Sequence, residues 1–196
     1  MSRNPKIKPG GNVPLYQLKI TLRWSKPPIW RRVVVRRDMK LDRLHDLIQI
    51  VMPWTNSHMH HFFAGETFYG QPDMGFAGMG SDELNEEDYS VADLAPTAKK
   101  KFMYEYDFGD SWAHELVVEK VLPPDPAFKH PTCLAGANAC PPDDCGGIPG
   151  YYSLLEVLAD PKHPEHANMK DWLGGAWDAA RFDLKRVNAL LKRLKT

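Results

Sequence analysis

The segment Tyr104–Leu116, with the sequence YEYDFGDSWAHEL, constrains the fold of this chain more than any other stretch. Apolar and polar residues alternate on both sides of the pair Gly109-Asp110. Alternation with a period of two is typical of β-strands, and glycine at the first central position suits a tight two-residue turn. The segment therefore predicts a β-hairpin, and its apolar flanks place that hairpin in the interior of the main sheet.

The predicted turn sets the register of this hairpin, and with it the face on which each side chain lies. Glu105 faces His114 across the two strands, and Asp107 faces Trp112. One face then gathers these four residues, whereas the other gathers Phe102, Tyr104, Tyr106 and Val117. Two acids and an imidazole on one face of a core hairpin require pairing, a ligand or a place at the rim of the sheet. This face is the first candidate functional site.

The rest of the chain predicts an α+β fold. Strands are expected over residues 16–24, 29–35, 58–63 and 66–70, and helices over residues 40–52, 150–159, 163–172 and 183–194. We expect a mixed sheet with a β-grasp-like N-terminal half, then the central hairpin and the C-terminal helices. Residues 1–13 hold prolines and glycines without periodicity and are expected to form a disordered lead-in. Residues 14–196 are expected to form a single domain.

Three histidines, His58, His60 and His61, precede the hairpin and supply further candidate ligands. His58 and His60 are spaced for one face of a strand, where they can share a metal ion. Alternatively, one histidine pairs with a nearby acid and the others face solvent. A fourth histidine, His45, lies off the apolar stripe of the helix predicted over residues 40–52, so it is expected at the surface or boundary.

All three cysteines lie in one loop rich in proline and glycine, spaced as Cys133-x6-Cys140-x4-Cys145. Structural zinc sites favour Cys-x2-Cys pairs, so this spacing is not that of a recognised zinc ribbon. With His130 the cysteines would complete a Cys3His zinc site. Alternatively, the thiols are simply buried, or two of them form a disulfide on isolation.

The same loop carries two adjacent acids, Asp143 and Asp144. The loop is expected to fold onto the hairpin, because the two glycines that follow permit a close approach of the backbone. A protonated imidazole at the hairpin would also gain from either carboxylate. One of the two aspartates should therefore lie within hydrogen-bond or shared-metal reach of Asp107, Asp110 and His114.

The charges are distributed unevenly, although the net charge is zero. The segment from Arg3 to Arg43 holds twelve lysines and arginines and two acids, whereas the segment from Leu44 to Ala98 holds nine acids and no lysine or arginine. A basic N-terminal segment can contact nucleic acid, but no nucleic-acid motif accompanies it, so mutual neutralisation is favoured. Neither a membrane-spanning run nor a signal peptide is visible, so a cytoplasmic protein is expected.

Two motifs resemble those of a known family. The hairpin motif Y-x-Y-D-F-G-D-x-W-x-H from Tyr104 and the loop motif C-P-P-D-D-C-G-G-x-x-G-Y from Cys140 closely resemble the plasmid pRiA4b ORF-3-like family. Further residues fit the same pattern: Leu44, His45, Trp54, His58, His60, Phe62, Phe182 and Asp183. The family usually has glutamate where this chain has Asp143, which keeps the charge and shortens the reach.

The resemblance implies a compact α+β domain, found in bacteria, in archaea and on mobile elements, whose biochemical function is not established. Some relatives carry a transposon-resolvase label. A serine recombinase needs a nucleophilic serine within an arginine cluster and a DNA-binding pair of helices. Neither Ser25 nor Ser111 has such a setting, so this activity is not carried over to the chain.

Two functional hypotheses follow from these residues. The favoured one is a non-catalytic binding or interaction module, in which no residue has a catalytic role. The alternative is a metal-dependent hydrolase built on the same residues, with a divalent metal such as zinc as the cofactor. The candidate binding cluster comprises Glu105, Asp107, Asp110, Trp112, His114, Asp143 and Asp144. The candidate metal ligands are Cys133, Cys140, Cys145, His58 and His60.

Overall fold

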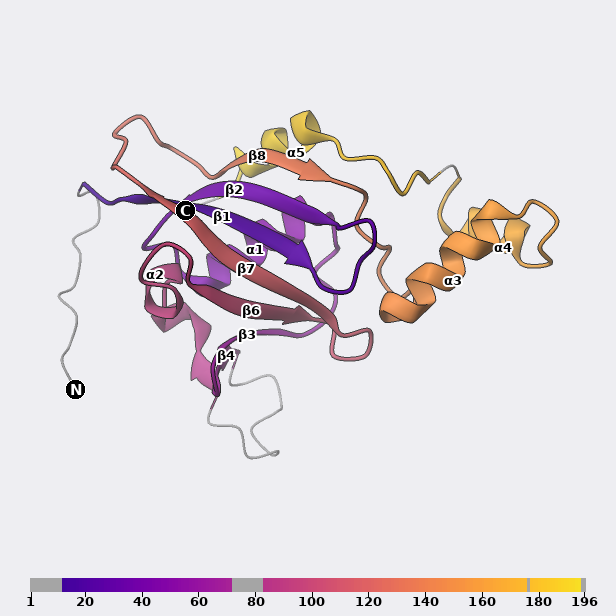
Figure 1. Cartoon of the computed structure of the whole chain (residues 1–196), viewed down its shortest axis with the longest axis horizontal. Helices are drawn as coiled ribbons and strands as arrows, with labels where there is room; N and C mark the ends of the chain where they lie inside the picture. Colours follow the sequence, from indigo (N-terminus) through magenta and orange to yellow (C-terminus); the bar gives the residue numbers. More distant parts are fainter. Residues whose placement is uncertain (1–11, 72–82, 176, 195–196) are drawn as a thin grey trace.

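The strands assemble into one eight-stranded mixed sheet, shown by a computed structural model that describes residues 12–71, 83–175 and 177–194 (Figure 1). Their order is β5-β4-β3-β6-β7-β1-β2-β8, and every pair is antiparallel except β4 with β5. The strands are β1 (Leu15–Leu22), β2 (Trp30–Arg36), β3 (His60–Ala64), β4 (Thr67–Gly70), β5 (Leu84–Asn85), β6 (Lys101–Tyr106), β7 (Trp112–Leu122) and β8 (Thr132–Ala137). The α-helices are α1 (Leu41–Val51), α2 (Val91–Leu94), α3 (Gly147–Ala159), α4 (His166–Trp172) and α5 (Leu184–Leu191).

This architecture confirms the main expectations from the sequence. The fold is α+β with a mixed sheet, and three of the described helices follow the last strand. The hairpin β6–β7 lies in the interior of the sheet, between β3 and β1. The β-grasp-like arrangement of the N-terminal half stays a prediction. Of the expected lead-in, residues 1–11 fall outside the described residues, whereas Val13 at its end is buried.

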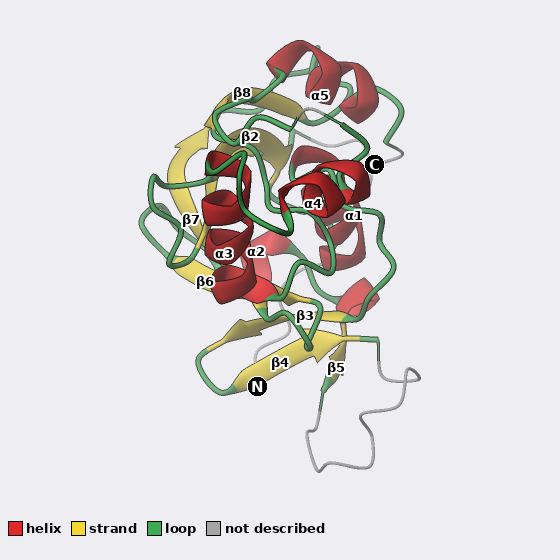
Figure 2. Ribbon diagram, turned by 90° about the vertical axis from the view of Figure 1, so that its right-hand side faces the viewer, coloured by secondary structure: helices red, strands yellow, loops and turns green. Residues whose placement is uncertain are grey.

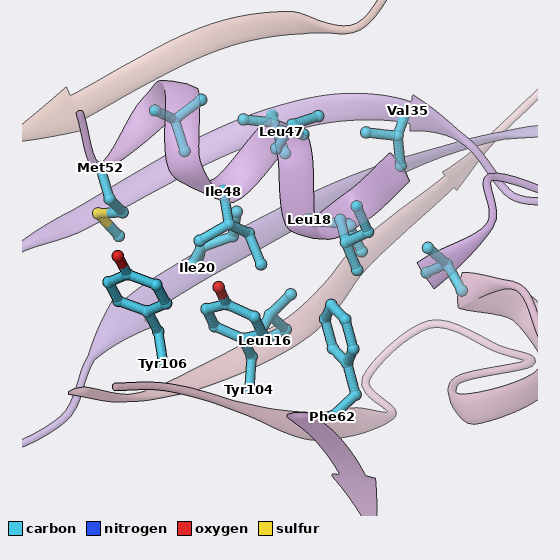
Figure 3. Close-up of a cluster of buried hydrophobic side chains, with 14 of the residues drawn as sticks. Leu18, Ile20, Val35, Leu47, Ile48, Met52, Phe62, Tyr104, Tyr106 and Leu116 are labelled. Carbon is cyan, nitrogen blue, oxygen red and sulfur yellow. The ribbon is translucent and has the colours of Figure 1, made fainter. Parts of the chain in front are cut away.

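Helix α1 packs against the sheet and forms the core with it (Figure 3). Leu47 and Ile48 are fully buried because apolar residues recur every three or four positions along α1. On the sheet side, Leu18, Phe62 and Tyr104 are also fully buried, and Figure 3 shows them pointing toward the helix. Burial of each such apolar side chain contributes about 1.5–3 kcal/mol to folding.

Helix α5 lies along the edge of the sheet beside β8 (Figures 1 and 2). The side-chain Nδ2 of Asn188 donates a hydrogen bond to the backbone carbonyl of Cys133 (2.9 Å), and its Oδ1 accepts one from the Cys133 N–H (2.9 Å). An edge strand otherwise presents such backbone groups without partners. The Asn188 amide therefore takes the place of a neighbouring strand at this position.

Helices α3 and α4 lie beyond the end of the sheet at which the β1–β2 and β6–β7 turns are found (Figure 1). The hydroxyl of Tyr152 on α3 accepts a hydrogen bond from the Lys26 N–H (2.6 Å) and donates one toward the Trp24 carbonyl (3.2 Å). These contacts hold α3 against the β1–β2 turn. None of the described helices has both the length and the apolar character that crossing a lipid bilayer requires.

The register of the central hairpin differs by one residue from the sequence prediction. Tyr104, and not Glu105, lies opposite His114. A slip of one residue moves every side chain of one strand to the other face relative to its partner. Trp112 and His114 are therefore fully buried on the face that carries Tyr104, whereas Glu105 lies on the opposite face and is partly exposed. The predicted grouping of two acids with Trp112 and His114 on one face is wrong.

The turn explains the slip, because it spans residues 107–111 rather than two residues. Asp107 and Ser111 adopt left-handed conformations, with φ of 58° and 53°, and the Ser111 N–H donates to the Asp107 carbonyl (2.6 Å). The Asp107 Oδ1 accepts hydrogen bonds from the N–H groups of Gly109 (2.9 Å) and Asp110 (3.3 Å). Aspartate tolerates this conformation because its side chain bonds locally in this way. Asp107 therefore belongs to the turn and does not pair with Trp112.

The buried imidazole of His114 makes the stability of the protein depend on pH. Burial lowers the pKa of His114 to about 3, and backbone groups of Trp112 and Tyr104 oppose this shift only in part. Above pH 6.5 the ring is neutral in both the folded and the unfolded chain. Between pH 6.5 and about pH 3 only the unfolded chain binds the proton. Each unit by which the pH is lowered in this window therefore reduces the free energy of unfolding by up to about 1.4 kcal/mol.

We expect the substitution His114→Phe to remove this part of the pH dependence. Urea denaturation at several pH values across the window measures the slope of stability against pH. Phe62→Leu is the control, since it changes a buried residue that does not titrate and should lower stability by the same amount at every pH. An H114F protein that loses stability on acidification as steeply as the wild type would contradict the expectation.

Candidate functional site

Three side chains from distant parts of the chain meet at the turn of the central hairpin. Nε2 of His58 lies 3.1 Å from Oδ1 of Asp144 and 3.7 Å from Oδ2 of Asp107. One ligand atom from each residue lies within 4.8 Å of the other two. We call these three residues the His–Asp triad. Within the described part of the chain, no other group of three or more His, Cys, Asp or Glu side chains converges in this way.

The backbone around each member of the triad holds it in place. Asp107 is fixed by its left-handed turn, and its N–H donates to the carbonyl of Met59 (2.8 Å), next to His58. The ring of His58 packs edge-on against Tyr106, with 5.8 Å between the centroids. Asp144 is also left-handed, with φ of 59°. The triad thus joins the segment before β3, the β6–β7 turn and the loop before α3.

The loop before α3 folds onto the hairpin turn, as the sequence predicted. The N–H of Gly146 donates a hydrogen bond to Oδ2 of Asp110 (3.1 Å). Gly147 has φ of 65°, and a Cβ atom there would lie 2.5 Å from the carbonyl oxygen of Asp110. Loop and turn therefore meet backbone to backbone, at a distance that leaves room only for glycine.

The same loop is also attached to the segment that follows α1. The indole Nε1 of Trp54 donates to the carbonyl of Pro141 (3.0 Å). Oδ2 of Asp143 accepts hydrogen bonds from both the N–H (3.1 Å) and the hydroxyl (2.8 Å) of Thr55. Asp143 therefore anchors the loop, and its neighbour Asp144 is the residue of the loop that takes part in the triad.

The triad is open to solvent on one side and is not a closed hydrogen-bonded cluster. Nε2 of His58 is buried, yet it makes no hydrogen bond of good geometry with the described residues. The side chain of Asp144 is 68% exposed, so one side of the triad is open to solvent. An imidazole with two carboxylates suits zinc and similar divalent cations, and three protein ligands leave coordination positions free.

A pocket of about 250 Å³ opens beside the triad. His58 belongs both to the triad and to the wall of this pocket, which His60, Gln71, Glu83 and Phe108 also line. Burial raises the pKa of the Glu83 carboxyl. The volume lies below the range of roughly 300–1,000 Å³ that is usual for small-molecule sites. The pocket therefore suits only a small group.

Behind the pocket, two buried histidines stack on each other. The rings of His45 and His60 lie 3.4 Å apart at an angle of 7°, and Nε2 of His60 is 2.9 Å from Oε2 of Glu86. The ring nitrogens of His45 form hydrogen bonds with the Tyr104 hydroxyl (2.8 Å) and with Oδ1 of Asn56 (2.7 Å). Burial, with a smaller effect of His60, lowers the pKa of His45 to about 3. The predicted surface or boundary position of His45 is wrong, because the residue is buried in the core, where these partners satisfy it.

Other predicted members of the binding cluster lie apart from the triad. Trp112 and His114 are in the core, as the register of the hairpin requires. Glu105 lies on the other face, 3.4 Å from Nε2 of His61, and accepts a hydrogen bond from the Ser111 hydroxyl (2.6 Å). The interaction with His61 lowers the pKa of Glu105. These residues support the turn from within the sheet and do not reach the triad.

His58 supplies the imidazole that was expected from His114. It was also expected to share a metal with His60, but His60 bonds to Glu86 instead. Strand β3 begins at His60, so His58 precedes the strand and does not follow its alternation. The sequence placed Asp143 or Asp144 within reach of Asp107, Asp110 and His114. Asp144 lies beside Asp107, and the loop bonds to Asp110 through the Gly146 N–H, but the prediction is wrong for His114, which is buried in the core.

The three cysteines do not form a group of metal ligands among the described residues. All three are free thiols, and Cys133 and Cys140 are buried. Burial raises the pKa of Cys140 above its ordinary value and that of Cys145 to about 12. Their expected role as metal ligands receives no support from the geometry.

Two residues near the site, Glu86 and Thr55, were not among the sequence candidates. Glu86 is buried beside His60, whereas its neighbours Glu87 and Asp88 are exposed. No local pattern distinguishes the buried acid from the exposed ones. The hydroxyl of Thr55 is likewise recruited by a loop far away in the sequence, which no local signal indicates.

Comparisons with known proteins agree with the motifs noted in the sequence. The family profile described as plasmid pRiA4b ORF-3-like protein matches residues 14–186. The chain is 36% identical over 174 residues to the uncharacterized protein y4hQ of Sinorhizobium fredii (strain NBRC 101917 / NGR234), covering 88% of each protein. It is also similar to the crystal structure of a protein of unknown function, MM3350 from Methanosarcina mazei Go1. That similarity has a TM-score of 0.81 at 32% identity and covers 90% of this chain and 97% of the other.

The close contact at Gly147 makes this position a test of how the site is assembled. We expect Gly147→Ala to destabilise the protein more than Gly65→Ala does. Both glycines have positive φ, so both variants lose about 1–2 kcal/mol from backbone strain. Only at Gly147 does the new methyl group also collide with the backbone of Asp110, whereas a Cβ at Gly65 would have no neighbour within 4 Å. The shift of the urea midpoint measures the difference, and equal shifts would mean that loop and turn are not in contact.

Proposed function

The chain belongs to the plasmid pRiA4b ORF-3-like family, and from this premise we propose that residues 14–196 form a single binding domain that holds a divalent cation at the His–Asp triad. The observation that carries the proposal is the convergence of His58, Asp107 and Asp144 on one point. The matched relatives are described as uncharacterized or of unknown function, so the proposal rests on the geometry of this chain.

The unsatisfied nitrogen of His58 supports a ligand at this point. A buried polar atom without a hydrogen bond costs about 1–3 kcal/mol. Nε2 of His58 is buried in this way although two carboxylates lie within 4 Å of it. A cation between the three side chains would satisfy the imidazole and neutralise both carboxylates at once.

The fixed and exposed parts of the triad indicate how the cation would act in binding. Asp107 is held rigidly because its Oδ1 is used by the turn, which leaves Oδ2 for a ligand. Asp144 lies on the solvent side. Because Asp144 is exposed and His58 also lines the small pocket, a cation held by the three side chains would be open to an anionic or carbonyl group of a partner molecule.

A metal-dependent hydrolase is the second candidate function, and one observation favours it. Catalytic zinc sites combine three protein ligands with an open position for water, and the triad has this composition. Glu83, whose pKa is raised by burial, lines the adjacent pocket and is a candidate to take up a proton from such a water.

Resolvase activity is not part of the proposal. The hydroxyl of Ser25 donates to the Leu22 carbonyl and accepts from the Ile29 N–H, and the hydroxyl of Ser111 donates to Glu105. Both serines thus serve local structure. Nucleic-acid binding through the basic N-terminal segment, a cytoplasmic location and an association with mobile elements stay predictions.

We expect metal-free protein to bind one Zn²⁺ or Mn²⁺ ion per chain in calorimetric titrations. His58→Gln, Asp107→Asn and Asp144→Asn should each weaken binding at least about tenfold, since each removes or neutralises a ligand. Asparagine is the appropriate replacement for the aspartates, because it tolerates the left-handed conformation that both residues adopt. Its Oδ1 can also accept the turn hydrogen bonds that Asp107 accepts.

His163→Gln and Asp160→Asn are matched controls for these variants. Both residues lie in the connection between α3 and α4, away from the triad, and their substitution should leave the affinity unchanged. Thermal melts of all variants without metal show whether weaker binding comes from the missing coordinating side chain or from a protein that no longer folds. Binding that survives with the same affinity in both H58Q and D107N would refute the metal site.

The hydrolase alternative is tested with the metal-loaded protein on chromogenic phosphate monoesters, phosphate diesters and carboxylic esters. A hydrolase should turn over one class faster than the free metal ion does. The activity should disappear on chelation and in Asp144→Asn, and Glu83→Gln should lower kcat while the metal remains bound. Metal binding without turnover in any class would leave the binding module as the function of the site.

A further inference from the structure

A second pocket, of about 520 Å³, lies between the end of α1 and helix α5, and no residue of the His–Asp triad lines it. Its walls include the aromatic rings of Trp54, Trp177 and Phe182. Its volume falls within the range of roughly 300–1,000 Å³ that is usual for small-molecule sites, and such sites combine apolar walls with a few polar groups. The function proposed above does not use this pocket.

Arg31 is the polar group inside this pocket, and it is buried without a countercharge. Only 1% of its surface is exposed, although it lines the pocket. No carboxylate of the described chain forms an ion pair with it. Burial lowers the pKa of the guanidinium, but arginine keeps its proton in proteins. A buried charge of this kind is costly unless it is paired.

The guanidinium is held in place by three carbonyl groups. Nε donates to the carbonyl of Val51 (2.8 Å), and Nη1 donates to those of Trp30 (2.8 Å) and Ala137 (2.9 Å). Within the described residues Nη2 has no hydrogen-bond acceptor, so its two N–H groups remain for a ligand. The carbonyls fix the orientation of the group, and they leave its positive charge uncompensated.

The ring of Phe182 packs against the guanidinium, with 4.1 Å between Cζ of Arg31 and the ring centroid. Gly136 makes this stack fit, because a Cβ there would lie 2.6 Å from the Phe182 ring and 2.9 Å from the Arg31 side chain. Phe182 and Asp183 fit the family pattern noted in the sequence, but neither residue takes part in the His–Asp triad. The stack holds the guanidinium of Arg31 in one orientation at the wall of the pocket.

Two more arginines, Arg181 and Arg186, line the pocket. The two aspartates of its lining are engaged by nearby backbone, since Oδ1 of Asp178 accepts from the Ala180 N–H and Oδ1 of Asp183 accepts from the Arg186 N–H. Oδ2 of Asp183 also lies 4.0 Å from Nη2 of the exposed Arg181. Three arginines and two aspartates leave an excess of positive charge around aromatic walls. The pocket therefore combines an apolar surface with an excess of positive charge that favours an anionic ligand.

We propose that this pocket binds a small organic anion with a flat apolar body, whose carboxylate or phosphate pairs with Arg31 and whose body lies against Trp177 and Phe182. The uncompensated buried guanidinium supplies the anion specificity, and the aromatic walls supply the contact area. Arg181 and Arg186 attract the same anionic group from the rim of the pocket. None of the three residues of the His–Asp triad lines this pocket, so the proposal does not rest on the cation proposed above.

Three naphthalene probes with the same flat body test this proposal on the full-length protein. They are 1-naphthoate, 1-naphthyl phosphate and the neutral 1-naphthalenemethanol, titrated by calorimetry. Both anions should bind at one site per chain, and the better of the two should bind at least about tenfold more tightly than the alcohol. The ratio of the affinities for 1-naphthoate and 1-naphthyl phosphate identifies the anionic group that the site prefers.

The rim arginines provide variants that keep the buried core intact. Arg181→Gln and Arg186→Gln should each weaken binding of the anions by about three- to tenfold and leave binding of the alcohol unchanged. Arg193→Gln is the control, an exposed arginine that follows α5 and is not part of the pocket lining. Arg31→Lys keeps the charge and loses Nη2, so a folded variant should lose most of the preference for anions.

Indole N–H signals in NMR spectra locate the probe. The anions should shift the signals of Trp177 and Trp54 and leave that of Trp24, which is exposed at the far β1–β2 turn, in place. Equal affinity for the alcohol and the anions, unchanged affinity in both R181Q and R186Q, or shifts confined to other tryptophans would each overturn the proposal.

Discussion

The hydrogen bonds between Asp107 and its own turn determine where most other features of this protein lie. Oδ1 of this residue accepts two backbone N–H groups, which stabilises a left-handed residue and a turn of five residues. That turn sets the register of β6 against β7, and the register places Tyr104 and His114 in the core. Oδ2 of the same carboxylate then points toward His58. Fold and candidate site therefore depend on one side chain.

The core behind the site is unusually polar, and its polar groups differ in how well they are satisfied. His45, His60, Glu86 and Tyr104 form hydrogen bonds with one another or with neighbours, so their burial costs little. The two ring nitrogens of His114 find no partner of good geometry among the described residues. The hydrogen bonds of His45 and Tyr104, in contrast, specify one arrangement of α1 on the sheet, because any other packing would leave these groups without partners.

Local periodicity was enough to predict most of the fold. The alternation in β1, the apolar stripe of α1 and the central place of the hairpin each depend on residues close together in the sequence. The register was not predictable, because Gly109-Asp110 indicates a two-residue turn, whereas the observed turn is held by the side chain of Asp107. The site was predicted in part. Asp107 and the aspartates of the loop were named, but whether His58 or His114 meets them depends on that register.

The contact between Asn188 and β8 has a consequence for the state of the protein in solution. β8 is the last strand of the sheet, and exposed Leu134 on it adds an apolar side chain to that edge. While the Asn188 amide occupies the backbone groups of Cys133, a strand from another molecule cannot pair there. Helix α5 therefore prevents the addition of another strand at this edge. A chain that ends before α5 would expose the edge of β8, where a second copy of the chain could pair with it.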